Sequence, residues 1–193
     1  MRRKPVDLRP WTTLSSRPVY RNKWISVRED VAALPDGRTT IYGVVTMGRA
    51  VGVVPLLADG RVVLVRQWRY VSREARWEIP TGGARPEESL EEAAQRELAE
   101  ETGYQAGRLT HLATFYSSKS VCDETCYIYL GEQLMPVDTH QEDETEFLEV
   151  QAFPLVEALD LVARSAIRDA MSVIGLLHAG RLVGALGTIL PGR

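Results

Sequence analysis

The sequence predicts an α/β protein in which helices cover a mixed β-sheet, and three observations support this fold class. Short apolar, β-branched and aromatic runs separated by turn signals fill residues 19–68, as is typical of consecutive strands. Residues 82–104 carry apolar side chains at helical spacing. Two further amphipathic helical segments follow at 154–163 and 167–178. Strands, a helix, more strands and more helices in this order predict an α/β/α sandwich with a mixed sheet.

The N-terminal part reads as a small β extension ahead of the main domain. Residues 1–16 form a basic lead-in, and residues 19–34 read as a strand. Pro35-Asp36-Gly37 is a tight turn, because glycine accepts a positive φ, and residues 39–47 are the returning strand. The predicted organisation is a β-hairpin extension at 1–48, a main domain at 49–180 and a C-terminal tail at 181–193.

Further strands of the main domain are predicted from apolar runs bounded by turns. Asp59-Gly60 joins the first two of them as a hairpin. The predicted strands are 50–57, 61–68, 108–116, 124–130 and 147–153.

The predicted central helix begins near Pro86, which suits a first helical turn, and ends at Gly103. Leu90, Ala94 and Leu98 recur every fourth residue and form an apolar stripe that faces the sheet. Glutamates that lie next to this stripe on a helical wheel should therefore be partly buried.

Three of these glutamates crowd the end of the helix. Glu97 and Glu101 flank the apolar stripe, and Glu100 lies beside them. Carboxylates three and four residues apart repel one another, and the helix dipole disfavours anions at this end. Arg96 can pair with Glu100, but one cation does not neutralise three carboxylates. A cluster of hard oxygen ligands favours Mg²⁺ or Mn²⁺ over zinc.

Composition excludes several classes of function. The chain has 193 residues with 45% hydrophobic and 25% charged residues, which are ordinary values for a soluble globular protein. The formal net charge of −3 argues against a nucleic-acid partner. No apolar run is long enough to span a membrane. Two cysteines and no secretory signal indicate a reducing, cytoplasmic setting.

The glutamate-rich segment resembles the signature box of the Nudix hydrolases. That box runs glycine, five residues, Glu, seven residues, then Arg-Glu-aliphatic-x-Glu-Glu-x-Gly-aliphatic. A match over so many fixed positions is a strong signal, although Tyr104 occupies the last place, which is usually aliphatic. The matching residues are Gly82, Glu88, Arg96, Glu97, Leu98, Glu100, Glu101 and Gly103.

The resemblance implies hydrolysis of a nucleoside diphosphate linked to another group, with Mg²⁺ or Mn²⁺ as cofactor. It implies that Glu97 and Glu101 bind the metal with Glu100 as a third carboxylate, and that the backbone oxygen of Thr81 is a further ligand. Arg96 would hold Glu100 in place. The strand-rich N-terminus resembles that of the ADP-ribose pyrophosphatase branch, which implies a nucleotide-sugar substrate and a homodimer.

Outside the box, the same resemblance implies substrate-binding and basic residues. Gln67-Trp68-Arg69 resembles the strand that carries a substrate-facing arginine in this branch, so Arg69 is the main candidate and Arg66 a weaker one. Glu124 stands where the branch has an acidic residue that binds metal or acts as base. The preceding loop departs from the family pattern at Ser120 and Val121. The reserve candidates for the base are Glu142, Glu144 and Glu146.

Two other functions were weighed against this one. A Nudix-like module that senses a nucleotide without cleaving it would usually show a broken box or a fused DNA-binding domain, and the sequence shows neither. A hydrolase of dinucleoside polyphosphates is also compatible with an intact box. The N-terminal hairpin and the Gln67-Trp68-Arg69 segment favour the nucleotide sugar instead.

Overall fold

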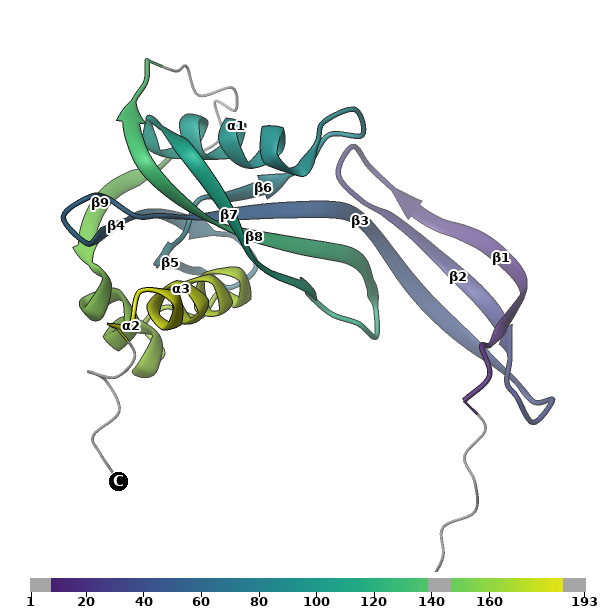
Figure 1. Cartoon of the computed structure of the whole chain (residues 1–193). Coiled ribbons are helices and arrows are strands. Elements are labelled where there is room, and N and C mark those ends of the chain that lie inside the picture. Colours follow the sequence, from purple (N-terminus) through teal and green to yellow (C-terminus); the bar gives the residue numbers. More distant parts are fainter. Residues whose placement is uncertain (1–7, 139–146, 186–193) are drawn as a thin grey trace, which may run out of the picture. The chain divides into compact units, whose positions relative to one another are not determined.

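The computed structural model describes residues 8–138 and 147–185 (Figure 1). These residues form two compact units, which we describe separately. Residues 8–48 with 116–124 make the first unit, and residues 49–115 with the rest of the described chain make the second. Strand β3 (Thr39–Pro55) belongs to both, because its first part lies in one unit and its second part in the other.

The first unit contains three antiparallel strands where the sequence predicted two. Strands β1 (Thr12–Arg21) and β2 (Ser26–Ala33) pair with each other, and β2 pairs with β3. The prediction of one continuous strand over residues 19–34 was therefore wrong, and part of the expected lead-in is strand. The chain turns at Asn22, whose side-chain oxygen accepts hydrogen bonds from the backbone N–H groups of Trp24 (2.9 Å) and Ile25 (2.8 Å).

The turn between β2 and β3 has the geometry that its residues predict. Gly37 has a φ of 87°, and its N–H donates to the Leu34 carbonyl at 3.0 Å. The Leu34 N–H donates in turn to the Arg38 carbonyl at 2.8 Å, which closes the hairpin.

The second unit contains two sheets and three helices. Strand β3 neighbours β8, β8 neighbours β7, and the short strand β6 pairs with β3. Strand β4 pairs antiparallel with both β5 and β9 in a separate sheet. The remaining elements are β4 (Arg61–Arg69), β5 (Glu74–Glu78), β6 (Thr81–Gly83), α1 (Leu90–Thr102), β7 (Tyr104–Tyr116), β8 (Cys122–Pro136), β9 (Glu149–Pro154), α2 (Leu155–Ala163) and α3 (Ala170–Leu182).

Two apolar cores lie on opposite faces of the larger sheet, as expected for a sandwich (Figure 1). Val51 and Val53 of β3 point to the core under α1, whereas Val54 points to the core under α2 and α3. In β8, Ile128 and Tyr129 divide between the two cores in the same way. Each fully buried aliphatic side chain contributes about 1.5–3 kcal/mol to folding. The fold class predicted from the sequence is thus confirmed.

Helix α1 begins later than predicted, at Leu90 instead of near Pro86. Ser89 is its N-cap: the Ser89 side chain accepts from the Glu92 N–H at 3.2 Å, and the Glu92 carboxylate accepts from the Ser89 N–H at 2.8 Å. Gly103 ends the helix with a φ of 71°. No helix of the described chain is both long and apolar enough to cross a membrane.

Two helical residues lie elsewhere than their spacing predicted. By its helical spacing Gln95 falls on the face away from the apolar stripe, but its amide donates to the Ala106 carbonyl at 2.6 Å and accepts from the Ala106 N–H at 3.0 Å. This strand edge next to α1 has backbone groups that need partners. Ile167 is buried but precedes α3, whose N-cap is Asp169. The Asp169 carboxylate accepts from the Ser172 N–H at 2.8 Å, so the helix begins at Ala170.

Candidate functional site

The loop before α1 is held against the last turn of that helix. Strand β6 pairs with β3 through Thr81 and Gly82. The Thr81 N–H donates to the Glu101 carboxylate at 3.2 Å, and Glu101 is only 5% exposed. The expectation that Glu101 is buried beside the apolar stripe is confirmed. The arrangement brings the Thr81 backbone next to the carboxylates of α1.

The Arg96 guanidinium lies among the carboxylates of the box. Its Nη1 donates to Glu97 at 2.7 Å and to Glu100 at 3.1 Å. Its Nε and Nη2 donate to the two oxygens of Glu88 at 2.8 and 3.0 Å, and Nη2 also donates to the Gly83 carbonyl at 2.9 Å. The predicted pairing of Arg96 with Glu100 is present. Arg96 therefore fastens the loop to the helix and orients two of the candidate metal ligands.

Four carboxylates and one guanidinium share this partly buried cluster. The side chains of Arg96, Glu97 and Glu88 are 17%, 13% and 16% exposed. Hydrogen bonds from Arg96 lower the pKa of Glu88 to about 2, and the backbone N–H of Arg85 adds to this effect. Glu88 in turn raises the pKa of Arg96. The Glu88 contribution to stability is complete above the unfolded carboxyl pKa and is lost as the pH falls towards 2.

The donor set of this cluster fits a hard divalent cation. Glu97, Glu100 and Glu101 offer carboxylate oxygens beside the backbone of Thr81, and oxygen ligands suit Mg²⁺ or Mn²⁺. Within residues 8–138 and 147–185, no group of three or more His, Cys, Asp or Glu side chains is already arranged to hold a metal ion. The Arg96 Nη1 bridges Glu97 and Glu100, so a cation would share or replace these contacts.

A glycine creates the space that the Glu97 carboxylate occupies. A Cβ atom at Gly82 would overlap the carboxyl carbon and both oxygens of Glu97, whereas a Cβ atom at Gly83 would meet nothing within 4 Å. Neither glycine has a positive φ. Gly82 is therefore required by the close approach of Glu97 and not by its backbone conformation.

Gly82→Ala is accordingly expected to lower kcat/KM roughly 10- to 10²-fold, because a displacement of about 1 Å at a site can cost this much. The Glu97 carboxylate is the flexible end of its side chain, so it can move aside and the midpoint of thermal unfolding should change little. Gly83→Ala is the matched control and should keep near-normal kcat/KM. Equal activities of the two variants in a magnesium titration would contradict this reading.

Arg69, the first substrate-binding candidate, ends β4 and pairs with a residue that the sequence reasoning did not select. Its Nε and Nη2 donate to Glu78 Oε2 at 3.0 and 2.6 Å. Burial disfavours the charged form of Arg69, but the hydrogen bonds that Arg69 donates to Glu78, together with the nearby negative charges, outweigh it and raise the Arg69 pKa. Glu78 follows Trp77 in the segment that leads into the box. This position was the signal by which the sequence could have identified Glu78 as a site residue.

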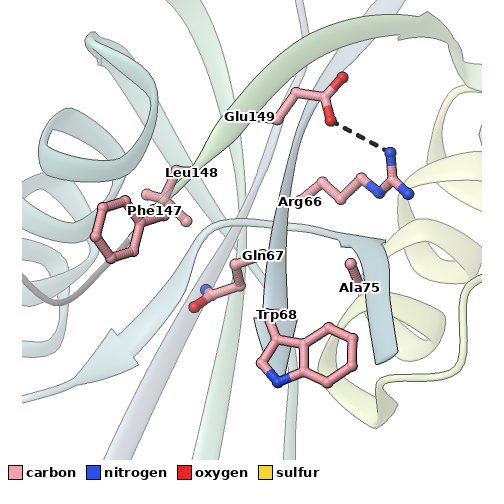
Figure 2. A pocket seen from close by; sticks show the side chains of 7 residues that line it. All are labelled: Arg66, Gln67, Trp68, Ala75, Phe147, Leu148 and Glu149. Atoms are coloured by element: carbon pink, nitrogen blue, oxygen red, sulfur yellow. Dashed lines mark hydrogen bonds and ion pairs between the residues drawn. The ribbon is translucent and has the colours of Figure 1, made fainter. Parts of the chain in front are cut away.

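Arg66, the second candidate, lines an open pocket of about 560 Å³ at the start of β9 (Figure 2). Its Nη1 pairs with Glu149 at 3.3 Å, and both side chains are exposed. Figure 2 shows the aromatic rings of Trp68 and Phe147 at the same pocket. The pocket combines polar and aromatic surface, and Arg66 and Arg69 do not share it.

The candidate bases lie outside the cluster that can be described. Glu124 is the third residue of β8 and is half-buried, but it belongs to the first unit, whereas the box belongs to the second. Glu142, Glu144 and Glu146 lie outside the described residues. The assignment of a base thus remains a prediction from the sequence.

The fold is an α/β sandwich, and a glycine-containing loop precedes a helix whose carboxylates contact one arginine. This combination is typical of phosphohydrolases. The chain belongs to the NUDIX domain family, which matches residues 46–172. Residues 11–45 match a second family, described as the nucleoside diphosphate sugar hydrolase N-terminal domain.

Several characterised proteins are similar over most of the chain. An ADP-ribose pyrophosphatase of Bacillus subtilis is 33% identical and covers 86% of this chain and 90% of its own. A GDP-mannose pyrophosphatase of Yersinia pestis is 32% identical, covering 63% of this chain and 65% of its own. A crystal structure of an ADP compounds hydrolase superposes with a TM-score of 0.84 at 26% identity, covering 95% of this chain and 99% of the other.

Proposed function

We propose that the protein hydrolyses the pyrophosphate bond of ADP-ribose or a related nucleotide sugar, giving a nucleoside monophosphate and a sugar phosphate. The observation that carries the proposal is that Arg96 contacts three carboxylates of the box, Glu88, Glu97 and Glu100. The fourth, Glu101, accepts from the Thr81 N–H in the loop beside them. Similarity to pyrophosphatases of ADP-ribose and GDP-mannose supports the substrate class. The substrate is anionic and the protein carries a net charge of −3, so the two repel each other unless the phosphates are neutralised at the site.

In the proposed mechanism, the residues of the box hold Mg²⁺ and the neighbouring residues hold the substrate. Glu97, Glu100 and Glu101 would bind the cation together with the Thr81 backbone oxygen, and Arg96 keeps the first two in position. Bound Mg²⁺ would neutralise the pyrophosphate and lower the pKa of the attacking water. Arg69 would bind a phosphate oxygen, while Glu124 would orient or deprotonate the water.

Strict dependence on a divalent cation is the first expected result. Excess EDTA should abolish turnover of ADP-ribose, and Mg²⁺ or Mn²⁺ should restore it. Persistent turnover in EDTA would refute the proposal.

A panel of ADP-ribose, GDP-mannose and dinucleoside polyphosphates, with phosphate-ester products measured, identifies the leaving group. Tight binding of a nucleotide without any product would instead indicate a sensing module.

We further propose that the protein is a homodimer formed partly through residues 17–48. Strand β1 is exposed along its whole length, and the first unit carries many large apolar side chains on its surface. Contiguous exposed apolar surface marks interaction sites in soluble proteins. These exposed residues include Trp11, Leu14, Val19, Tyr20, Trp24, Ile41 and Met47.

Light scattering at micromolar concentration should therefore give a mass of about twice 21.6 kDa. Replacing Ile41, which is 67% exposed, with Lys should shift the mass towards the monomer. A monomer in the unmodified protein would rule the dimer out. Cys122 and Cys126 are both free thiols. We also propose a reducing, cytoplasmic setting for the protein.

A further inference from the structure

An ion pair outside the box holds one edge of the Arg69 side chain. Two guanidinium nitrogens, Nε and Nη2, face the Glu78 carboxylate at 2.6–3.3 Å. The Glu78 side chain is 8% exposed, whereas that of Arg69 is 42% exposed. In the part of the chain that the structure describes, the remaining terminal nitrogen of Arg69 has no hydrogen-bond partner. The arginine is thus fixed along one edge and accessible along the other.

Glu78 itself belongs to a segment that is fastened on both sides. It is the last residue of β5, and it directly precedes Ile79, whose N–H donates to the Ser172 hydroxyl at 2.9 Å. Ser172 is fully buried, and its hydroxyl donates to Asp169 at 2.8 Å. Two residues after Ile79, the Thr81 N–H donates to Glu101. The same short segment therefore anchors both Arg69 and the loop next to the candidate metal ligands.

Arg69 and Glu78 both line a cavity of about 370 Å³. The charge on Glu101 contributes to the raised pKa of Arg69, so Arg69 lies within electrostatic reach of the box. The other lining residues are Val71, Ser72, Glu74, Arg76, Arg168 and Asp169.

We propose that Glu78 is a positioning residue that presents the free edge of Arg69 to the pyrophosphate, an inference that rests on the proposed function. A bidentate carboxylate fixes the plane of a guanidinium, which a single hydrogen bond does not. The structural alternative is that Glu78 only neutralises Arg69. The two roles predict opposite changes in kcat/KM when the charge of Glu78 is removed. Removal of a mere counter-charge would strengthen the attraction of an anionic substrate, whereas removal of a positioning group weakens productive binding.

A double-mutant cycle in the full-length enzyme separates these roles. Glu78→Gln keeps the shape of the side chain and one acceptor oxygen, and we expect it to lower kcat/KM for ADP-ribose roughly 10- to 10²-fold. Arg69→Gln should lower kcat/KM at least as much. In the Arg69→Gln background, Glu78→Gln should change kcat/KM less than about 2-fold, because the group it positions is gone. The magnesium concentration that gives half-maximal activity should stay unchanged in all three variants.

Glu132→Gln is the matched control, since Glu132 pairs with Arg108 at the same distance of 2.6 Å between two other strands. It should keep near-normal kcat/KM. If Glu78→Gln does not fold, Glu78→Asp keeps the charge but shortens its reach, and it should lower kcat/KM when Arg69 is intact but not in the Arg69→Gln background. Additive effects of the two substitutions, or a rise in kcat/KM, would overturn the proposal. An inactive wild-type enzyme would instead refute the proposed function.

Discussion

Glu124→Gln is expected to bind substrate almost normally and to lower kcat by roughly 10²–10⁴, the usual contribution of a positioned base. The substitution preserves the shape of the side chain and removes its negative charge and its ability to accept a proton. Because the substrate does not need this charge to bind, KM should change little. Steady-state kinetics at saturating Mg²⁺, combined with binding of the unreacted substrate to the variant, measures both quantities.

Asp123→Asn is the matched control for this variant. Asp123 is an exposed neighbour of Glu124 on β8, and successive side chains of a strand point to opposite faces. The control should keep near-normal kcat. If Glu124→Gln also keeps near-normal kcat, the base is one of Glu142, Glu144 or Glu146, and each can be tested by the same substitution.

Glu97→Gln is expected to weaken both metal affinity and turnover. The carboxylate lies 2.7 Å from Arg96, and the amide can still accept this hydrogen bond, so the fold should persist. Loss of the charge removes a ligand from the cluster. Even residues that only support a ligand typically change metal affinity 10- to 100-fold, so a lost ligand should cost at least about 10²-fold in kcat at fixed low Mg²⁺.

The two variants should differ most clearly in a magnesium titration. Glu97→Gln should need more Mg²⁺ to saturate and should recover part of its activity at high concentration, whereas Glu124→Gln should saturate normally at a low maximum. Glu91→Gln, an exposed position on the first turn of the same helix, controls for loss of charge from α1. A normal titration curve for Glu97→Gln would remove Glu97 from the metal ligands.

Features that depend on near neighbours in the chain could be predicted from the amino-acid sequence alone. The spacing of Leu90, Ala94 and Leu98 predicts a helix with one buried face, and Gly103 predicts its end, because helix periodicity and capping act within a few residues. The burial of Glu101 follows from the same periodicity. The turn at Gly37 likewise depends on the φ angle of one residue. These features therefore needed no knowledge of the rest of the fold.

Tertiary packing sets which distant charges meet and which backbone groups need side-chain partners. Arg96 reaches back eight residues to Glu88. Arg69 pairs with Glu78 although the register of β4 and β5 places Glu74 opposite Arg69 and Val65 opposite Glu78, so strand pairing alone does not predict this ion pair. The amide of Gln95 is taken up by the backbone of Ala106. A pattern of residue types specifies faces and ends of elements, but an ion pair between elements depends on register, loop path and burial, which are set by the packing of the whole unit.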